Sequence, residues 1–262
     1  MSIEMMHDLR GRTAVVIGGA RDLGYDIAEI LAAAGCDLAL TSRDLKRAEA
    51  AAERLRGDYG HQVESAALDI CDPDQVATCA ERMPTADVLV NNAGGGLDLH
   101  PTHFFDRDPV HIAQLIDTNL TGMLYCCQAF GRGMAARGSG SIINIASIAG
   151  LCGRDRRMYD QTGLPEQPLE YAAAKARVVG ATRDLAGLLS PMGVRANAIS
   201  PGGFERGQPQ SFIEAYSRAT PMGGMGRDGV DLKGAALFLA SDASAYVTRQ
   251  NLIVDGGFAI WK

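Results

Sequence analysis

The chain has 262 residues, of which 47% are hydrophobic and 21% are charged, and its formal net charge at pH 7 is −6. This composition is typical of a globular enzyme with a large core, and the acidic balance disfavours binding to nucleic acid. The N-terminal stretch carries acidic residues, and no run of about 18 apolar residues follows anywhere in the chain. We therefore expect neither export nor membrane spanning, and the cytoplasm is the expected compartment.

Six cysteines lie mostly within apolar, periodic segments, and they are Cys36, Cys71, Cys79, Cys126, Cys127 and Cys152. No pair has CxxC spacing, and none stands close to histidines, which disfavours a metal site. The sequence therefore predicts reduced thiols, mostly in the core, and no bound metal.

Short β-branched runs alternate with amphipathic stretches along the whole chain. The runs predict strands at residues 13–17, 37–42, within 61–70, within 86–94, at 141–147 and at 195–200. The amphipathic stretches predict helices after residue 21, at 43–56, 73–82, 109–133 and 169–189. Strands that alternate with helices of this length require parallel pairing and right-handed crossovers. We expect one α/β domain over residues 1–262, with a doubly wound parallel sheet covered by helices on both faces.

Ligands of such sheets bind beyond the carboxyl ends of the strands. Gly18, Gly19 and Gly24 follow the first strand and open its helix, where backbone N–H groups can face a pyrophosphate. Arg21, Asp22 and Leu23 complete this turn and are expected to border the same group. The alternative is a glycine-rich tight turn that binds nothing.

The end of the second strand bears on the choice of nicotinamide cofactor. Folds that prefer NAD place an acidic residue there for the ribose hydroxyls, whereas this chain has Ser42 followed by Arg43. A guanidinium suits a 2′-phosphate, so we expect NADP rather than NAD. If Arg43 is only a solvated residue beside an N-cap at Asp44, NAD remains open.

Tyr171 and Lys175 in YAAAK stand one helical turn apart, so both side chains lie on one face. An ammonium beside a phenol favours the phenolate and would lower the tyrosine pKa from about 10. Such a hydroxyl can exchange a proton with an alcohol or ketone oxygen. The spacing alone is weak, since YxxxK pairs occur by chance on many helices.

Further motifs occur in a recognisable order. They are IGGARDLG (17–24), NNAG (91–94), Asn119, Ser147, YAAAK (171–175), NAISPG (197–202) and VDGG (254–257). Together they resemble the short-chain dehydrogenase/reductase family over essentially the whole chain. The resemblance implies a Rossmann-type fold that binds NAD(P), and an oxidoreductase that transfers a hydride between nicotinamide and a secondary alcohol or ketone.

The resemblance also implies roles for single residues. In the family, Tyr171 would exchange the proton, Lys175 would bind the nicotinamide ribose and tune Tyr171, Ser147 would orient the reacting oxygen, and Asn119 would hold a relay water. The residues that would contact the cofactor are Gly18, Arg21, Asp22, Leu23, Gly24, Ser42, Arg43, Asp69, Ile70, Asn92, Ala93, Gly94, Tyr171, Lys175, Pro201 and Gly202. Asn119 as a helix-bending core residue, and one asparagine of NNAG as a backbone partner, remain alternatives. A homotetramer or homodimer is implied, joined by helices near 109–133 and 168–189.

Four residues depart from the family pattern at the cofactor end and in the C-terminal part. Asp22 replaces the middle glycine of the turn, and because its carboxylate would repel a diphosphate we expect it to point away and cap the helix. Arg206 replaces a threonine in the substrate lid, expected at 202–221, where it would act through charge, turn to substrate or face solvent. Gly224 and Arg249 exchange residues that are commonly arginine and glycine.

The catalytic serine and tyrosine are farther apart than in most of the family, which implies an active-site insertion at 151–168. Its Arg154, Arg157 and Tyr159, with Arg206 of the lid as a further candidate for substrate contact, favour a small polar substrate such as a sugar, polyol or sugar acid. The insertion, together with RGQPQSF and TPMGGMG later in the chain, resembles gluconate 5-dehydrogenase-like reductases. The arginines as a solvated face form the alternative. A 3-oxoacyl thioester reductase and a catalytically idle NAD(P)-binding regulatory protein remain alternative functions.

Overall fold

A computed structural model describes residues 2–95, 103–160, 162 and 164–261 of the chain. Its main sheet is entirely parallel and has the strand order β3-β2-β1-β4-β5-β6-β9. The strands are β1 (Thr13–Ile17), β2 (Asp37–Ser42), β3 (Val63–Ala67), β4 (Val88–Asn91), β5 (Gly140–Ile145), β6 (Val194–Pro201) and β9 (Asn251–Val254). The predicted doubly wound fold is therefore confirmed.

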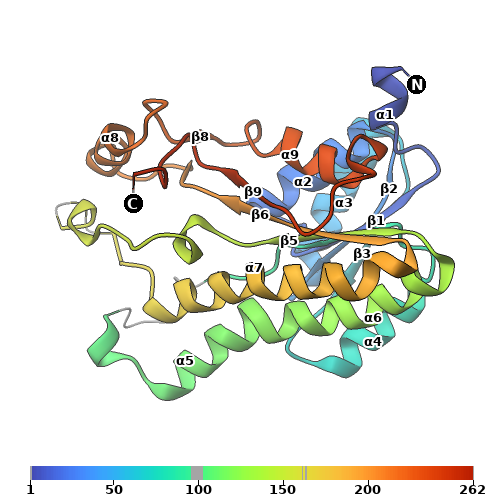
Figure 1. The fold of residues 1–262 in the computed structure, drawn as a ribbon, viewed down its shortest axis with the longest axis horizontal. Coiled ribbons are helices and arrows are strands. Elements are labelled where there is room, and N and C mark those ends of the chain that lie inside the picture. The colour runs from blue at the N-terminus through green and yellow to red at the C-terminus, as the bar shows by residue number, and fades with distance from the viewer. Residues whose placement is uncertain (1, 96–102, 161, 163, 262) are drawn as a thin grey trace.

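Helices cover both faces of the sheet (Figure 1). One layer holds α2 (Asp22–Ala33), α3 (Leu45–Tyr59) and α9 (Lys233–Ala240). The other holds α4 (Pro73–Arg82), α5 (Pro109–Ile116), α6 (Gly122–Arg137) and α7 (Leu169–Leu189). Because both faces are covered, the central strands are continuous apolar runs, and every residue of β4 is buried.

The strand order reverses between β1 and β4, which both pair with their neighbours in parallel register. A crevice forms at such a switch point beyond the carboxyl ends of the strands. The segment after β6 extends beyond this edge as β7 (Phe204–Glu205), α8 (Gln210–Ala219) and β8 (Gly226–Arg227), where β7 pairs with β8. In Figure 1 α8 lies at the outer end of the molecule, next to the C-terminus.

The structure departs from the predicted elements in two places near the site. The helix expected at 109–133 consists of α5, a π-helical turn at Asp117–Thr121 and α6, which continues to Arg137. The third strand, expected within 61–70, already ends at Ala67, so Asp69 and Ile70 lie in the loop before α4. The apolar face of the helix continues through the π-helical turn, so the hydrophobic periodicity of the sequence does not predict that turn.

Three further findings concern the remaining expectations. Among the described residues, no helix is both long and apolar enough to cross a bilayer. The cysteines are all free, and four of the six are buried, in line with the predicted reduced thiols. Arg249 has a left-handed backbone with φ +68°, which explains why glycine is common at this position, whereas nothing in the structure explains Gly224.

Candidate active site

A cavity of about 1000 Å³ runs along the carboxyl edge of the sheet, from the end of β2 to the start of α7. It brings together all but one of the residues that the sequence assigns to the cofactor. Its walls include Gly18, Arg21, Asp22, Leu23, Ser42, Arg43, Asp69, Ile70, Asn92, Ala93, Gly94, Tyr171, Lys175, Pro201 and Gly202. Gly24 lies behind this wall, and its role is explained by packing.

The turn after β1 is built by glycines that tolerate close backbone contacts. Gly18 has φ +74° and donates its N–H to the Thr41 carbonyl at 3.0 Å. A Cβ at Gly24 would lie 2.1 Å from the Gly18 oxygen, so only glycine lets α2 approach the turn this closely. The Asn92 side chain donates to the Gly18 carbonyl at 2.9 Å, so this asparagine is a backbone partner, as the sequence allowed.

Asp22 departs from its expected geometry. It has φ +53°, a backbone conformation that favours glycine, and it begins α2 without capping it, since the N-cap is Arg21 and no side chain accepts a capping bond. The predicted cap is therefore wrong. The half-exposed carboxylate instead lies 3.5 Å from the Arg21 guanidinium and 3.8 Å from that of Arg206.

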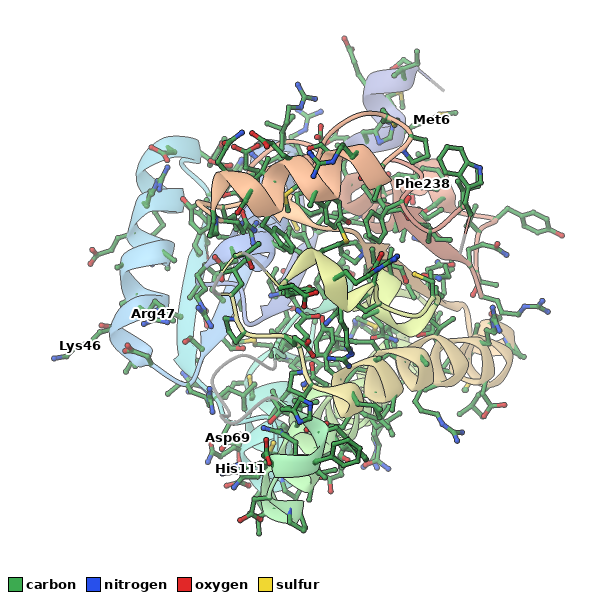
Figure 2. All side chains as sticks on the ribbon, turned by 90° about the vertical axis from the view of Figure 1, so that its left-hand side faces the viewer. Met6, Lys46, Arg47, Asp69, His111 and Phe238 are labelled. Atoms are coloured by element: carbon green, nitrogen blue, oxygen red, sulfur yellow. The ribbon has the colours of Figure 1, made fainter. Side chains whose placement is uncertain are left out.

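The adenosine end of the cavity carries two arginines. Asp44 is the N-cap of α3, accepting from the Arg47 N–H at 3.3 Å, while Ser42 accepts from the Asp44 N–H at 3.1 Å. These bonds leave the exposed Arg43 side chain at the cavity wall, together with Arg47. Figure 2 shows Arg47 on the outer part of α3. Sequence reasoning missed Arg47, although its place one turn after Arg43 was available as a signal.

Lys175 and Tyr171 stand on one face of α7, as predicted. The Lys175 Nζ atom donates to the Ile145 carbonyl at the end of β5 at 2.9 Å, and it lies 5.7 Å from the Tyr171 ring centroid. The lysine is only 5% exposed, and burial lowers its pKa to about 8. The ammonium is therefore fixed at the point where the sheet meets the catalytic helix.

The direction of the Tyr171 pKa corrects the sequence-based argument. Burial raises this pKa above its usual value of 10.0, while a hydrogen bond with Ser147 and the charge of Arg154 lower it. Desolvation prevails, so the expected net lowering by Lys175 is wrong in this structure. A phenol that stays protonated at neutral pH is suited to donate a proton to a ketone oxygen.

Ser147 follows β5 and opens the 3₁₀ turn Ile148–Gly150, where its hydroxyl accepts from the Ala149 N–H at 3.1 Å. The turn packs directly on the catalytic helix, because a Cβ at Gly150 would lie 2.4 Å from the Ala176 nitrogen. This close approach places Ser147 beside Tyr171.

Asn119 is buried in the π-helical turn and faces the NNAG loop. Its amide donates to the Gly95 carbonyl at 2.8 Å and to the Leu115 carbonyl at 3.0 Å, while its oxygen accepts from the Gly95 N–H at 3.1 Å. A Cβ at Gly94 would lie 2.5 Å from the Asn119 oxygen and 3.3 Å from Lys175 Nζ. Gly94 therefore lies between Asn119 and Lys175 and leaves no room for a larger side chain.

The insertion residues assigned to substrate lie in different surroundings. Arg154 lines the cavity and donates to the side-chain oxygen of Gln167. Arg157 is 86% exposed, pairs with Asp155 at 2.7 Å and lies outside the cavity wall. Its expected contact with substrate is therefore not supported. Tyr159 lines the cavity as well, and its ring packs on the lid helix. Residues 161 and 163 of the insertion lie outside the described part of the chain.

Arg206 is turned toward the phosphate turn. Its guanidinium lies 3.1 Å from Asp26 and 3.8 Å from Asp22, and it also pairs with Asp228. Of the three roles that the sequence left open, this geometry supports action through charge at the cofactor end rather than contact with substrate or exposure to solvent.

Aromatic side chains of α8 and of the C-terminal segment line another part of the cavity. Sequence reasoning missed part of this aromatic cluster. The Tyr216 ring stacks on Phe258 at 4.3 Å, and Phe212 lies between Tyr216 and Tyr159. The Tyr216 hydroxyl accepts from the Gly203 N–H at 2.6 Å, which ties α8 to the end of β6. Phe258 follows VDGG in the sequence, but no local pattern marks it as a partner of α8.

Comparisons with known proteins agree with this geometry. A family profile described as enoyl-(acyl carrier protein) reductase matches residues 18–259. Galactitol 2-dehydrogenase (L-tagatose-forming) of Cereibacter sphaeroides is 33% identical, with 100% of both chains covered. A 3-oxoacyl-(acyl-carrier-protein) reductase of Chlamydia trachomatis is 34% identical over 96% of this chain and 98% of its own.

Among solved structures, a gluconate 5-dehydrogenase from Burkholderia cenocepacia, in complex with NADP and tartrate, superposes with a TM-score of 0.87. It is 31% identical, and 99% of each chain is covered. The match extends over the glycine turn, the catalytic helix and the segment around α8. The chain belongs to the short-chain dehydrogenase/reductase family, whose members bind NAD(P) and act on CH–OH groups of small molecules.

Proposed function

We propose that the protein is an NAD(P)-dependent oxidoreductase that interconverts a secondary alcohol and a ketone of a small polar substrate. The observation that carries this proposal is that Tyr171, Ser147 and Lys175 lie together and line the same cavity as the glycine turn. When bound, the dinucleotide supplies or accepts the hydride.

Residues of the chain would carry out the proton transfer, orient the substrate and hold the cofactor. Tyr171, whose burial favours the protonated phenol, donates the proton to the ketone oxygen and takes it back in the reverse direction. Ser147 shares a hydrogen bond with that phenol and orients the same oxygen. Lys175 holds the nicotinamide ribose, and Asn119, separated from it by Gly94, supports the path by which the proton is replenished.

The cavity fits a dinucleotide. Its volume is in the range of cofactor sites, and the close contacts at Gly18 and Gly24 leave bare backbone where a pyrophosphate would lie. Two arginines, Arg43 and Arg47, line the adenosine end with no acidic side chain at the last position of β2. We infer from this charge that NADP is preferred to NAD.

The substrate would enter between the insertion at 151–168 and the lid at 202–221. Arg154 brings a cation to this wall, and Gln167 and Tyr159 add polar groups. These polar groups face the aromatic side chains of Phe212, Tyr216 and Phe258, and we infer that they select a sugar, polyol or sugar acid. The galactitol 2-dehydrogenase and the gluconate 5-dehydrogenase, relatives by sequence and by structure, support the same class.

The assembly is proposed to be a homotetramer or homodimer of one-domain subunits in the cytoplasm. Apolar side chains are exposed on the helices expected to join the subunits, namely Val110, Leu124, Leu169 and Leu188. Such side chains on neighbouring helices are suited to a symmetric contact with a second copy.

A titration with NADPH and NADH, followed by nicotinamide fluorescence, tests the cofactor proposal. We expect tighter binding of NADPH, and Arg43→Ala should remove the preference with little effect on NADH. A panel of keto-sugars, keto-acids and 3-oxoacyl thioesters then tests the substrate class. The rate of reduction is measured as the loss of absorbance of the reduced nicotinamide. Faster reduction of the thioesters would replace the proposal by the alternative that the chlamydial relative represents.

A further inference from the structure

Two residues that depart from the family pattern meet in space. Asp22 occupies the position of a glycine in the phosphate turn, and Arg206 occupies that of a threonine 184 positions later. Their side chains form an ion pair at 3.8 Å, and both line the cavity. This ion pair therefore joins the two positions at which the chain carries a charge where the family pattern has an uncharged residue.

The surroundings of Arg206 are strongly acidic. Its guanidinium lies 3.1 Å from Asp26 and pairs with Asp228, and Asp26 also accepts the Gly229 N–H at 3.2 Å. Asp26 is 7% exposed, and burial raises its pKa. Asp22 lines the cavity together with Arg206, whereas Asp26 and Asp228 do not. Asp26 and Asp228 therefore bind the guanidinium on the side that faces away from the cavity.

A carboxylate at this point opposes the binding of a dinucleotide. The phosphate turn carries the partial positive charge of the α2 N-terminus, which attracts a diphosphate, and the Asp22 carboxylate cancels that attraction at close range. Arg21 lies 3.5 Å from Asp22 but is 61% exposed, so water screens its charge. The Arg206 side chain is only 23% exposed and is held in place by Asp26 and Asp228, so water screens its interaction with Asp22 less than that of Arg21.

We propose that Arg206 is the counter-charge that allows a phosphate turn carrying Asp22 to accept the cofactor diphosphate. Arg206 is thus a positioning residue for the cofactor rather than a contact of the substrate. Because Arg206 follows directly after β7, at the entry to α8, the same pair ties the lid segment to the cofactor turn. This inference rests on the dinucleotide site proposed above.

The competing explanation is that Arg206 only fastens the lid segment to α2. In that case its removal would weaken cofactor binding equally with either residue at position 22. A charge compensation makes the opposite prediction, because without Asp22 there is no charge for Arg206 to offset. The two explanations are separated by a double-mutant cycle.

The experiment measures the NADPH Kd of the wild type, Arg206→Thr, Asp22→Gly and the double variant at low ionic strength. We expect Arg206→Thr to weaken binding about tenfold, the size of one coupling between partly exposed charges. Asp22→Gly should bind at least as tightly as the wild type. In the Asp22→Gly background, Arg206→Thr should weaken binding less than about threefold. Arg206→Lys, which keeps the charge, should retain most of the affinity, and added salt should diminish the loss in Arg206→Thr.

Arg227→Ala is the matched control, because Arg227 pairs with Asp231 on the same segment but is 73% exposed and outside the cavity wall. Its Kd should equal that of the wild type. Equal losses for Arg206→Thr in both backgrounds, or no loss in either, would overturn the inference while leaving the dinucleotide site intact. If the wild type binds neither dinucleotide, both this inference and the proposed function fail.

Discussion

The ring of Tyr159, from the insertion, lies 5.2 Å from the ring of Phe212 on α8. The described part of the insertion therefore packs on α8, and Met158 and Leu164 add to the same apolar cluster. This contact suggests a structural role for the additional residues between Ser147 and Tyr171. They hold α8 over the part of the cavity where substrate is expected.

Tyr159→Ala tests this role. Loss of the ring removes an aromatic pair worth about 0.5–1.5 kcal/mol beyond its buried area, so α8 should close less tightly. We expect the KM for substrate to rise several-fold while the NADPH Kd stays unchanged, measured by steady-state kinetics and fluorescence titration. Tyr246→Ala, which removes a fully exposed tyrosine, serves as control. An equal effect of both variants would contradict the packing role.

Arg154 should set the pH range of catalysis through its charge. This charge lowers the pKa of Tyr171, so Arg154→Gln should raise that pKa further. Alcohol oxidation needs the phenolate as proton acceptor, and its rate should therefore rise at a higher pH than in the wild type. The measurement is kcat against pH with an uncharged polyol. Arg157→Gln, whose arginine pairs with Asp155 outside the cavity, should leave the profile in place. An unshifted profile in Arg154→Gln would refute the coupling.

Lys175 should make stability depend on pH in the alkaline range. Its pKa is about 8 in the folded chain and near the ordinary 10.5 when unfolded, so the unfolded state binds the additional proton between these values. Stability from this group therefore rises with pH from about 8 to 10.5. Below that range the buried ammonium costs about 3 kcal/mol.

Lys175→Met removes this cost. Its free energy of unfolding should exceed that of the wild type at pH 7, and the difference should shrink by pH 10, measured in urea. Lys46→Met, which changes a lysine on the exposed side of α3 (Figure 2), should follow the wild type at every pH. A constant difference between Lys175→Met and the wild type would show that the lysine titrates normally.

A buried ion pair anchors the start of the catalytic helix. Arg107 and Glu170 approach to 2.5 Å with side chains 0% and 4% exposed, and Glu170 directly precedes Tyr171. Glu170→Gln leaves the guanidinium charge buried, so we expect a loss of about 3–5 kcal/mol in unfolding free energy. Glu166→Gln, which breaks the more exposed pair with Arg156, should cost less than about 1 kcal/mol. Similar losses from both variants in urea unfolding would contradict this assignment.

Much of the fold followed from the sequence because its signals are local. The strand at 37–42 and the helices at 73–82 and 169–189 were predicted with the bounds that the structure has. The helix at 73–82 is the clearest case, because Asp72 caps it and Pro73 begins it.

The parts that sequence reasoning missed depend on contacts between distant segments. The ion pairs of Arg206 with Asp22 and Asp26 could not be predicted from the sequence, because the folded chain brings these residues together from distant segments. The direction in which the Tyr171 pKa is shifted depends on the burial of the side chain. The four-residue spacing of Tyr171 and Lys175 does not predict that burial. The site residues themselves were found through short motifs, and their roles remain predictions.

The most direct test of the account is Tyr171→Phe, which removes only the hydroxyl that would carry the proton. NADPH titration and steady-state reduction of a keto-sugar or keto-acid turned over by the wild type should be measured on the same preparation. The account predicts an unchanged NADPH Kd and a loss of kcat of at least about a hundredfold, the typical contribution of a positioned proton donor. Turnover retained at near the wild-type rate would contradict the proposed catalytic centre.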